Sequence, residues 1–328
     1  RLHGDTIRLL ANGYDWLRAF LVDTAIIDQT GVLFSDSASH FGYGNLDARV
    51  ARVTNSQFLG LGQGQILQFQ GGDFFADNVT LTGCSQPVPG CDGAYGLYLN
   101  IGAAALDARV RNSSFTRIAY PVSSSLNQPG VIEATNLTMD SVISGIQVGG
   151  DSIVIRNNIV TRASNFAISA DGVISARGST ISNNTVGCVP ALAFTNGIAA
   201  YNRRYAVDSN LVQATCFTGI YASNVQGGSR LRGNTVRATD TGIRISQFDT
   251  TAVLIDSNAV SGATTAAVHV QSGRVVMRHN NIGNNAYGVY IPGFVGLGQI
   301  VSDNNSFTNN SSYAIFAPFD TVNAVNNW

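Results

Sequence analysis

Lysine is absent from this chain, and glutamate occurs only once, as Glu133. Charged residues make up 12% of the 328 residues, well below the quarter that is usual in globular proteins. Lys and Glu favour helices, whereas the Asn, Asp, Gly and Ser that are abundant here favour turns. The composition therefore predicts a protein rich in strands and turns.

Other absences bear on partners and location. The formal net charge is −1 and no basic stripe is present, so nucleic acid is not expected as a partner. No run of 18 apolar residues occurs, so no membrane span is expected. A signal peptide is recognised by a charged start followed by an apolar core. The first residues show no such pattern. Because the numbering begins at Arg1, a leader could have been removed.

An asparagine followed by any residue and then an apolar residue recurs every 21 to 26 residues. A fixed period of this length indicates a repeat architecture in which each unit packs on its neighbours. Asparagine suits the bends of such a repeat, and stacked amides can bond to each other. We therefore interpret these asparagines as scaffold. They are Asn158, Asn184, Asn210, Asn234, Asn258, Asn280, Asn305 and Asn326.

A second motif follows each asparagine by about ten residues: a small residue, an apolar residue, a variable residue and another small or apolar residue. Examples are GIYA (219–222), GIRI (242–245) and AVHV (267–270). Such alternation is typical of a strand. Strands that pair with their equivalents one coil away, about 4.8 Å apart, form a parallel β-helix. We predict an all-β, single-domain β-helix over residues 1–328, with about 12 coils of 22–26 residues.

Some segments fit the repeat less well. Residues 1–50 are the least regular, and residues 14–28 are compatible with a short helix or two strands. Residues 83–94 interrupt one coil and are expected to form a loop at the side of the stack. A leucine-rich repeat is rejected, because Val, Ile and Ala rather than Leu fill the apolar positions.

The chain has four cysteines. Cys84 and Cys91 enclose a short loop with two prolines, and Cys188 and Cys216 occupy similar places in successive coils. We expect two disulfides, which indicates an oxidising location, secreted or at the cell surface. Four buried free thiols are the alternative. A zinc site is not expected, because no CxxC or nearby histidine accompanies the cysteines.

The NN-x-V/I turns, the GI-x-V strands, the segment GDTIRLLANGYD (4–15) and the closing NNW (326–328) resemble the right-handed parallel β-helix proteins of the pectate-lyase-like superfamily. The resemblance covers nearly the whole chain and implies right-handed winding. The superfamily includes pectin and alginate lyases, polygalacturonases, uronan epimerases, phage tailspikes and adhesive surface proteins. It therefore predicts the fold but not one activity.

The activity motifs of several subfamilies are missing. There is no adjacent Asp pair and no GHG, as in polygalacturonases, and no DPHE, as in one type of uronan epimerase. The clustered acidic calcium ligands of pectate lyases are not visible, because Glu133 stands alone. We expect no cofactor and no metal site, although stacked coils could bring Asp residues together around calcium.

The variable position of each strand motif should point outward, because its apolar neighbours point inward. These positions hold Tyr98, Gln147, Ser169, Ala199, Tyr221, Arg244, His269, Tyr290 and Phe316. The last five would stand on consecutive rungs and span about 19 Å. Aromatic rings pack against sugar faces. Tyr98, Gln147, Tyr221 and Phe316 are therefore candidate substrate-binding residues.

Three outward residues also suit catalysis on a uronic-acid polymer. Arg244 could bind a carboxylate through two hydrogen bonds, His269 could act as base, and Tyr290 could act as acid. Cross-strand ladders of this composition also stabilise exposed sheets with no ligand. Tyr201 and Arg203 lie in an aromatic and basic turn that could contact an acidic sugar or serve solubility alone.

The sequence thus predicts a secreted or cell-surface β-helix that binds polysaccharide along one strand face, with lyase or epimerase activity as the finer hypothesis. A structural or adhesive rod without a catalytic site, or a trimeric phage or appendage component, is the alternative. No pattern in the sequence predicts the oligomeric state.

Overall fold

The structure is a computed structural model that describes residues 16–35, 43–61, 65–70, 72–83, 95–100, 106–125, 130–172, 178–189, 195–213, 216–237, 239–247, 251–293 and 300–328. All regular elements in these ranges are strands. Across the same ranges, no helix is long and apolar enough to cross a membrane. The predicted all-β class is confirmed.

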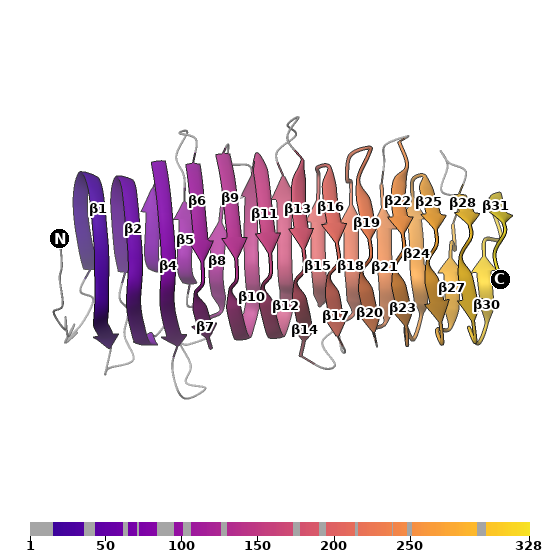
Figure 1. The fold of residues 1–328 in the computed structure, drawn as a ribbon, viewed down its shortest axis with the longest axis horizontal. Coiled ribbons are helices and arrows are strands. Elements are labelled where there is room, and N and C mark those ends of the chain that lie inside the picture. The colour runs from indigo at the N-terminus through magenta and orange to yellow at the C-terminus, as the bar shows by residue number, and fades with distance from the viewer. Residues whose placement is uncertain are drawn as a thin grey trace.

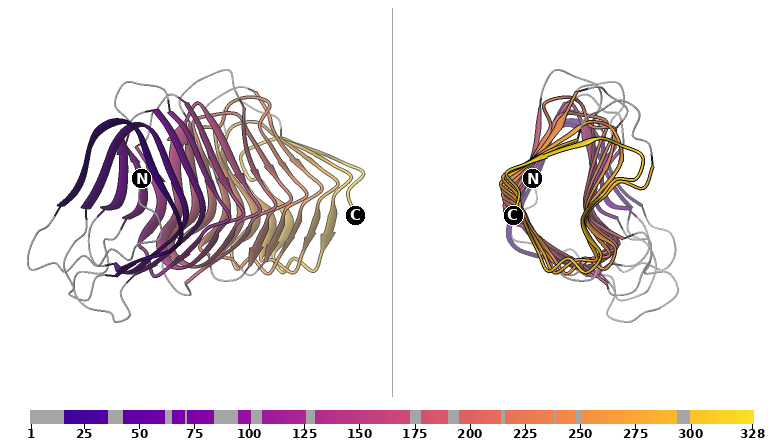
Figure 2. Two further views of the ribbon diagram at one scale, coloured as in Figure 1. Left: turned by 60° about the vertical axis from the view of Figure 1, so that its left-hand side comes forward. Right: turned by 90° about the vertical axis from the view of Figure 1, so that its right-hand side faces the viewer.

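The strands stack side by side along one long axis, from β1 at one end to β31 at the other (Figure 1). Seen along that axis, the successive coils overlie one another and enclose the interior (Figure 2). Every pairing is parallel and joins equivalent strands of neighbouring coils, as with Tyr221 and Arg244. The chain is therefore a parallel β-helix, as predicted.

The strands form three sides of each coil. The first side holds β3 (Gln65–Gln70), β5 (Tyr95–Asn100), β8 (Tyr120–Ser124), β15 (Asn196–Tyr201), β18 (Thr218–Ser223), β21 (Thr241–Ser246), β24 (Ala266–Ser272), β27 (Tyr287–Tyr290) and β30 (Tyr313–Phe316). The second holds β6 (Leu106–Arg111), β9 (Gly130–Thr135), β11 (Ser152–Arg156), β13 (Ser179–Ser182), β16 (Tyr205–Asp208), β19 (Arg230–Arg232), β22 (Val253–Asp256), β25 (Val275–Arg278), β28 (Ile300–Asp303) and β31 (Val322–Val325). The third holds β7 (Ser114–Thr116), β14 (Thr185–Cys188), β17 (Leu211–Gln213), β20 (Thr235–Arg237), β23 (Ala259–Ser261), β26 (Asn281–Gly283) and β29 (Ser306–Thr308). Longer strands that continue from one side to the next are β1 (Trp16–Ser35), β2 (Tyr43–Leu61), β4 (Gly72–Gly83), β10 (Thr138–Gly150) and β12 (Ile159–Gly172).

Two details of the expected repeat need correction. Paired residues on the first side are separated by 21 positions at Val268 and Val289, but by 30 at Leu67 and Leu97. The repeat length therefore varies over a wider range than 22–26 residues. The predicted count of about 12 coils assumed that range and is inexact. The segment 14–28 is strand rather than helix from Trp16 onward. The loop 84–94 and the segment 4–15 lie outside the described residues.

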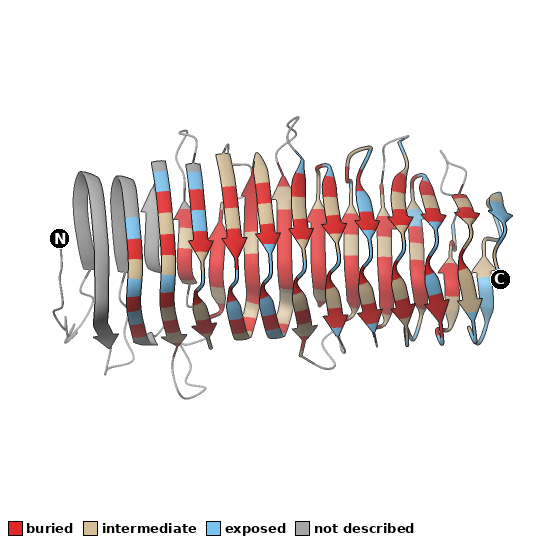
Figure 3. Cartoon of the chain, viewed as in Figure 1, coloured by how far each residue is buried: buried red, intermediate tan, exposed pale blue. Residues whose placement is uncertain are grey.

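Apolar side chains fill the interior, and the buried residues of neighbouring strands line up from coil to coil (Figure 3). One such row starts from the apolar residues two positions after the ladder asparagines and is buried throughout. Each buried valine stabilises the fold by about 1.5–3 kcal/mol relative to exposure. The row comprises Val160, Val186, Val212, Val236 and Val260, and Ile282 continues it.

The small residue that opens each strand motif is required by this row. A Cβ atom at Gly219 would lie 2.5 Å from Cγ1 of Val236 and 2.6 Å from the carbonyl oxygen of Gly242. Contacts this close cannot be relieved without moving the backbone of the next coil. The Gly of GI-x-V therefore lets the strand approach the interior, and it has no part in a site.

The asparagine ladder is confirmed as scaffold. Each side-chain amide donates from Nδ2 to the Oδ1 of the asparagine one coil further on, at 2.8–3.1 Å. The eighth member is Asn327, not Asn326, which instead has φ 50°. The members are Asn158, Asn184, Asn210, Asn234, Asn258, Asn280, Asn305 and Asn327.

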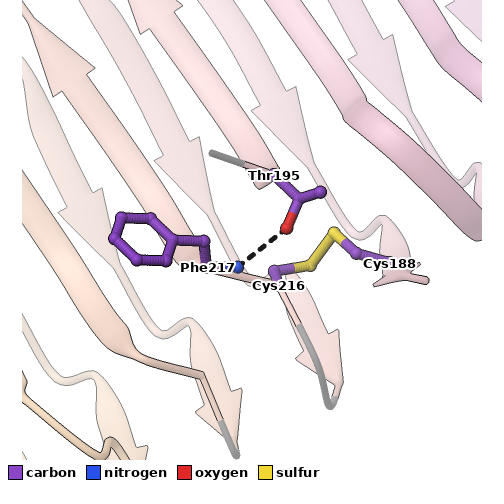
Figure 4. The surroundings of a disulfide bond; sticks show 4 residues. All are labelled: Cys188, Thr195, Cys216 and Phe217. Atoms are coloured by element: carbon purple, nitrogen blue, oxygen red, sulfur yellow. Dashed lines mark hydrogen bonds between the residues drawn. A yellow bond between two sulfur atoms is a disulfide. The ribbon is translucent and has the colours of Figure 1, made fainter. Parts of the chain in front are cut away.

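The predicted bond between Cys188 and Cys216 is present, with the two Cα atoms 4.9 Å apart. It joins the end of β14 to the residue two positions before β18, and so links adjacent coils (Figure 4). Beside it, the amide of Phe217 donates to Oγ1 of Thr195 at 2.9 Å. This disulfide fits an oxidising location outside the cytoplasm. The predicted pair Cys84–Cys91 lies outside the described residues.

Candidate functional site

Five predicted outward residues form one continuous row on the first side. Each is the register partner of the next, on β18, β21, β24, β27 and β30, which lie side by side in Figure 1. All five are half-buried, whereas the chain neighbours of the first four, such as Ile243 and Ile245, are buried. The row, named here the C-terminal row, consists of Tyr221, Arg244, His269, Tyr290 and Phe316.

Arg244 and His269 are neighbours at the centre of this row. The guanidinium carbon of Arg244 lies 5.4 Å from the centroid of the Tyr221 ring. On the other side, the His269 and Tyr290 rings are 5.3 Å apart and edge to face. Nε of Arg244 and Nε2 of His269 are buried, and neither has a hydrogen-bond partner in the described part of the chain. A buried polar group normally has a partner, so two unpaired nitrogens on neighbouring rungs distinguish this part of the row.

The imidazole of His269 is held in its neutral form. Burial, reinforced by the positive charge of Arg244, lowers the pKa of His269 to about 4, and the opposing effect of Asp240 only partly offsets this. At neutral pH the ring therefore keeps a nitrogen lone pair that can accept a proton. A neutral base next to a permanent cation is an arrangement suited to an anionic substrate.

The end of the row is surrounded by more aromatic rings than the sequence predicts. Tyr287 and Tyr313 lie three positions before Tyr290 and Phe316 on the same strands, and they stack on each other at 6.1 Å. The Tyr290 and Phe316 rings also stack, at 5.6 Å. The sequence does contain a sign of these extra rings, because a tyrosine directly precedes the strand motif at Tyr287 and at Tyr313. These four side chains provide a broad apolar surface beside His269.

The outward row continues toward the N-terminus, but it changes character. Ser123, which the sequence motif missed, stands between Tyr98 and Gln147. Ser123, Ser169 and Ala199 are buried, so Gln147 is the one residue between Tyr98 and Tyr221 in this row that is partly open to solvent. Tyr98 and Gln147 are half-buried, and they are separated from the C-terminal row by Ser169 and Ala199. The structure does not bring them together with Arg244.

Of the two candidates in the 201–205 turn, only one adjoins the row. The Tyr201 ring contacts the Tyr221 ring at 5.7 Å, at right angles, and burial raises the pKa of Tyr201 to about 12. Arg203 has no exposed surface, and its Nη1 donates to the carbonyl oxygen of Gly150 at 2.7 Å. The structure therefore gives no support to the prediction that Arg203 binds substrate, because its guanidinium is engaged inside the coil.

Acidic residues elsewhere serve the scaffold. Glu133 accepts hydrogen bonds from Arg111 at 2.6 Å and Arg156 at 3.1 Å on the second side. Among the described residues, no three His, Cys, Asp or Glu side chains gather closely enough to hold a metal ion. The expectation that no cofactor is needed stays a prediction.

Residues 174–327 match a family described as the right handed beta helix region. Solved structures with a similar fold include a single-substitution variant of the periplasmic alginate epimerase AlgG, with TM-score 0.54 and 12% identity. A doubly substituted variant of that epimerase gives TM-score 0.52 and 12% identity. In both cases the match covers 90% of this chain and 76% of the other. No curated protein is significantly similar in sequence. The predicted right-handed β-helix is confirmed, and at this level of identity the likeness concerns the fold.

Proposed function

We propose that the C-terminal row of this right-handed parallel β-helix binds an acidic polysaccharide and that Arg244 and His269 catalyse lyase or epimerase chemistry on it. The observation that carries the proposal is that Arg244 and His269 are register partners on adjacent strands, and that Nε of Arg244 and Nε2 of His269 lack hydrogen-bond partners among the described residues. The solved structures with this fold include an enzyme named as an alginate epimerase, which acts on a uronic-acid polymer.

The reaction begins with loss of the proton on the carbon that bears the carboxylate. His269 accepts this proton, and the electron pair left behind spreads onto the carboxylate. Arg244 stabilises the charge that develops there. Stabilisation of this kind by a preorganised cation is usually the largest single contribution to the rate enhancement of an enzyme. Because the pKa of His269 is about 4, the ring is deprotonated and ready at neutral pH.

The second half of the reaction decides the product. In an epimerase, an acid returns a proton to the opposite face of the same carbon. In a lyase, the electron pair expels the glycosidic oxygen, which takes a proton and leaves a carbon–carbon double bond. Tyr290 lies one rung beyond His269, with its ring 5.3 Å from the imidazole, and is the residue that we propose as acid.

Binding is proposed to use the aromatic rings at both ends of the row. Tyr221 on one side and Phe316 on the other can pack against sugar faces. Tyr201, next to Tyr221, extends this surface by one ring. We propose that the protein acts outside the cell or at its surface, where such polymers occur.

The test is incubation with polymannuronate, polyguluronate and polygalacturonate. Ultraviolet absorbance detects the unsaturated lyase product, and proton NMR in deuterated water detects epimerised, deuterium-labelled sugar. Arg244→Ala and His269→Gln should each reduce turnover by about 100-fold or more. Matched controls are Arg237→Ala, an exposed arginine on β20, and His279→Gln, an exposed histidine next to β25. Equal turnover by wild type and both site variants would refute the catalytic proposal.

A rod without catalysis is the second candidate. The stacked rings of Tyr287 with Tyr313, and of Tyr290 with Phe316, could serve to stabilise an exposed sheet. In that case the polymers would remain unchanged. Tyr290→Ala and Phe316→Ala would then lower the melting temperature without changing the retention of the protein on any polymer in affinity electrophoresis.

A further inference from the structure

Asp240 ties together the two strands that carry Arg244 and His269. It lies directly before β21, and its Oδ1 accepts hydrogen bonds from Oγ1 of Thr264 at 2.8 Å and of Thr265 at 2.7 Å. These threonines directly precede β24, the strand of His269. One carboxylate oxygen thus fixes the start of the second strand to the start of the first.

The backbone of Asp240 adds to the same connection. Its carbonyl oxygen accepts from the amides of Thr265 at 2.8 Å and Ala266 at 3.4 Å, and its own amide donates to the carbonyl of Cys216 at 3.4 Å. Its second carboxylate oxygen, Oδ2, accepts from Oγ1 of Thr241 at 3.3 Å. The residue therefore bonds to its own coil, to the coil of His269 and to the disulfide cysteine of the preceding coil.

The charged and titratable groups around His269 come from three elements. Strand β21 contributes Arg244, strand β27 contributes Tyr287 and Tyr290, and the turn before β21 contributes Asp240. Arg244 disfavours the protonated imidazole, and Asp240 favours it. Asp240 is thus the acidic residue of this group that opposes the effect of the arginine.

We propose that Asp240 is the positioning residue of this site: its carboxylate holds the His269 strand in register beside Arg244 and supplies the negative charge that balances the guanidinium next to the imidazole. The inference rests on the proposed function for its catalytic meaning. Its structural and electrostatic content can be measured without any polymer.

The test uses Asp240→Asn in the full chain. The amide oxygen can still accept from the threonine hydroxyls, but the charge is removed. Proton NMR titration of the histidine ring signals, assigned with His269→Gln, should show a lower pKa for His269 in Asp240→Asn than in wild type. Asp256→Asn is the matched control, because Asp256 contacts His279, with Oδ1 3.1 Å from Nδ1, and should leave His269 unchanged. An unchanged or higher pKa of His269 in Asp240→Asn overturns the electrostatic part of the inference.

The positioning part is tested by Thr265→Val, which removes one hydroxyl donor and keeps the carboxylate. With the polymer that wild type converts, kcat should fall by about 10-fold to 100-fold, since small misplacements of a catalytic group have effects of that size. KM should change little, and Thr265→Ser should restore kcat. Wild-type kcat in Thr265→Val would overturn this part.

The two proposals fail in different ways. If His269→Gln keeps full activity, or no polymer is converted, the proposed function fails while the titration result for Asp240 stands. If the titration is unaffected by Asp240→Asn while His269→Gln is inactive, only the inference about Asp240 fails. If Asp240→Asn does not fold, the titration is repeated with Asp240→Glu, which keeps the charge on a longer side chain. A wild-type pKa of His269 together with a lower kcat would then support the inference, and a wild-type kcat would refute it.

Discussion

Arg244 and His269 are register partners on adjacent strands, and the cation on one rung reinforces the effect of burial on the next in keeping the imidazole neutral. A histidine in an ordinary environment has a pKa near 6.5 and is half protonated in mildly acidic water. Here a permanent positive charge stands beside the ring. Protonating His269 would place two positive charges on neighbouring rungs.

This relationship predicts an unusual acid limit for activity. A base with a pKa of about 4 stays functional from neutral pH down to about that value, so kcat/KM should decline near pH 4 and not near 6.5. The measurement is kcat/KM as a function of pH on the polymer that is converted. A half-maximal value near pH 6.5 would show that His269 is not the titrating base.

The same shift has a consequence for stability. The folded-state pKa of about 4 lies below the unfolded value of 6.5, so the unfolded chain binds more protons between these values. The free energy of unfolding therefore falls as the pH drops from 6.5 toward 4 and is unaffected by this group above 6.5. His269→Gln should flatten this part of the dependence, as measured by urea unfolding at a series of pH values.

A second prediction concerns the close approach of strands at Gly219. Gly219→Ala should lower the free energy of unfolding by about 1–3 kcal/mol, as overpacking typically does, because the new methyl would meet Val236 and the Gly242 carbonyl. Gly293→Ala is the control, since no heavy atom lies within 4 Å of the position of its Cβ. Denaturant unfolding followed by circular dichroism compares the two, and equal midpoints would contradict the packing argument.

A third prediction concerns the asparagine ladder. Asn234 accepts from the backbone amide of Asn210 at 2.9 Å and from its side chain at 3.0 Å, and donates to the carbonyl of Val207 at 2.8 Å. Asn234→Ala removes the acceptor of the buried Asn210 backbone amide and the side-chain donor to Val207, while the Asn210 side chain keeps its bond to the carbonyl oxygen of Ile181. The expected loss is about 1–3 kcal/mol for each group left unsatisfied. Asn281→Ala, at an exposed position on β26, should change unfolding by less than about 0.5 kcal/mol. Similar losses in both variants would argue against a structural role for the ladder.

A fourth prediction concerns the disulfide. Replacing both Cys188 and Cys216 by Ala removes a cross-link between residues 28 positions apart, which costs about 3–4 kcal/mol by the chain-entropy model. Thermal and urea unfolding under oxidising conditions measure this loss. Because the double variant lacks this bond already, any further effect of a reductant on it must arise elsewhere in the chain.

Much of the scaffold could be predicted because its causes are local and periodic. The alternation in GIRI requires Ile243 and Ile245 to face inward, which leaves Arg244 outside whatever the neighbouring coils contain. The repeat then places His269 beside it. These two steps are sufficient to predict the C-terminal row from the sequence.

Other features could not be predicted from the sequence, because they depend on contacts between coils. Arg203 is buried because Gly172, one coil earlier, leaves room: a Cβ there would lie 2.4 Å from its Cδ. In the early coils, Asn55, Asn78, Asn112 and Asn136 occupy the left-handed corner of the backbone (φ 50° at Asn55), one place before the ladder position. Asp240 belongs to no sequence motif. Its proposed role depends on the hydrogen bonds that it accepts from Thr264 and Thr265 in the next coil.

The outward row takes one residue from each coil, and the residues directly before it, such as Ile220, Ile243 and Val268, are buried because successive side chains of a strand point to opposite faces of the sheet. Selection on the surface and selection on the core can therefore act on separate positions. A rod built in this way can change its ligand one rung at a time while its architecture is retained.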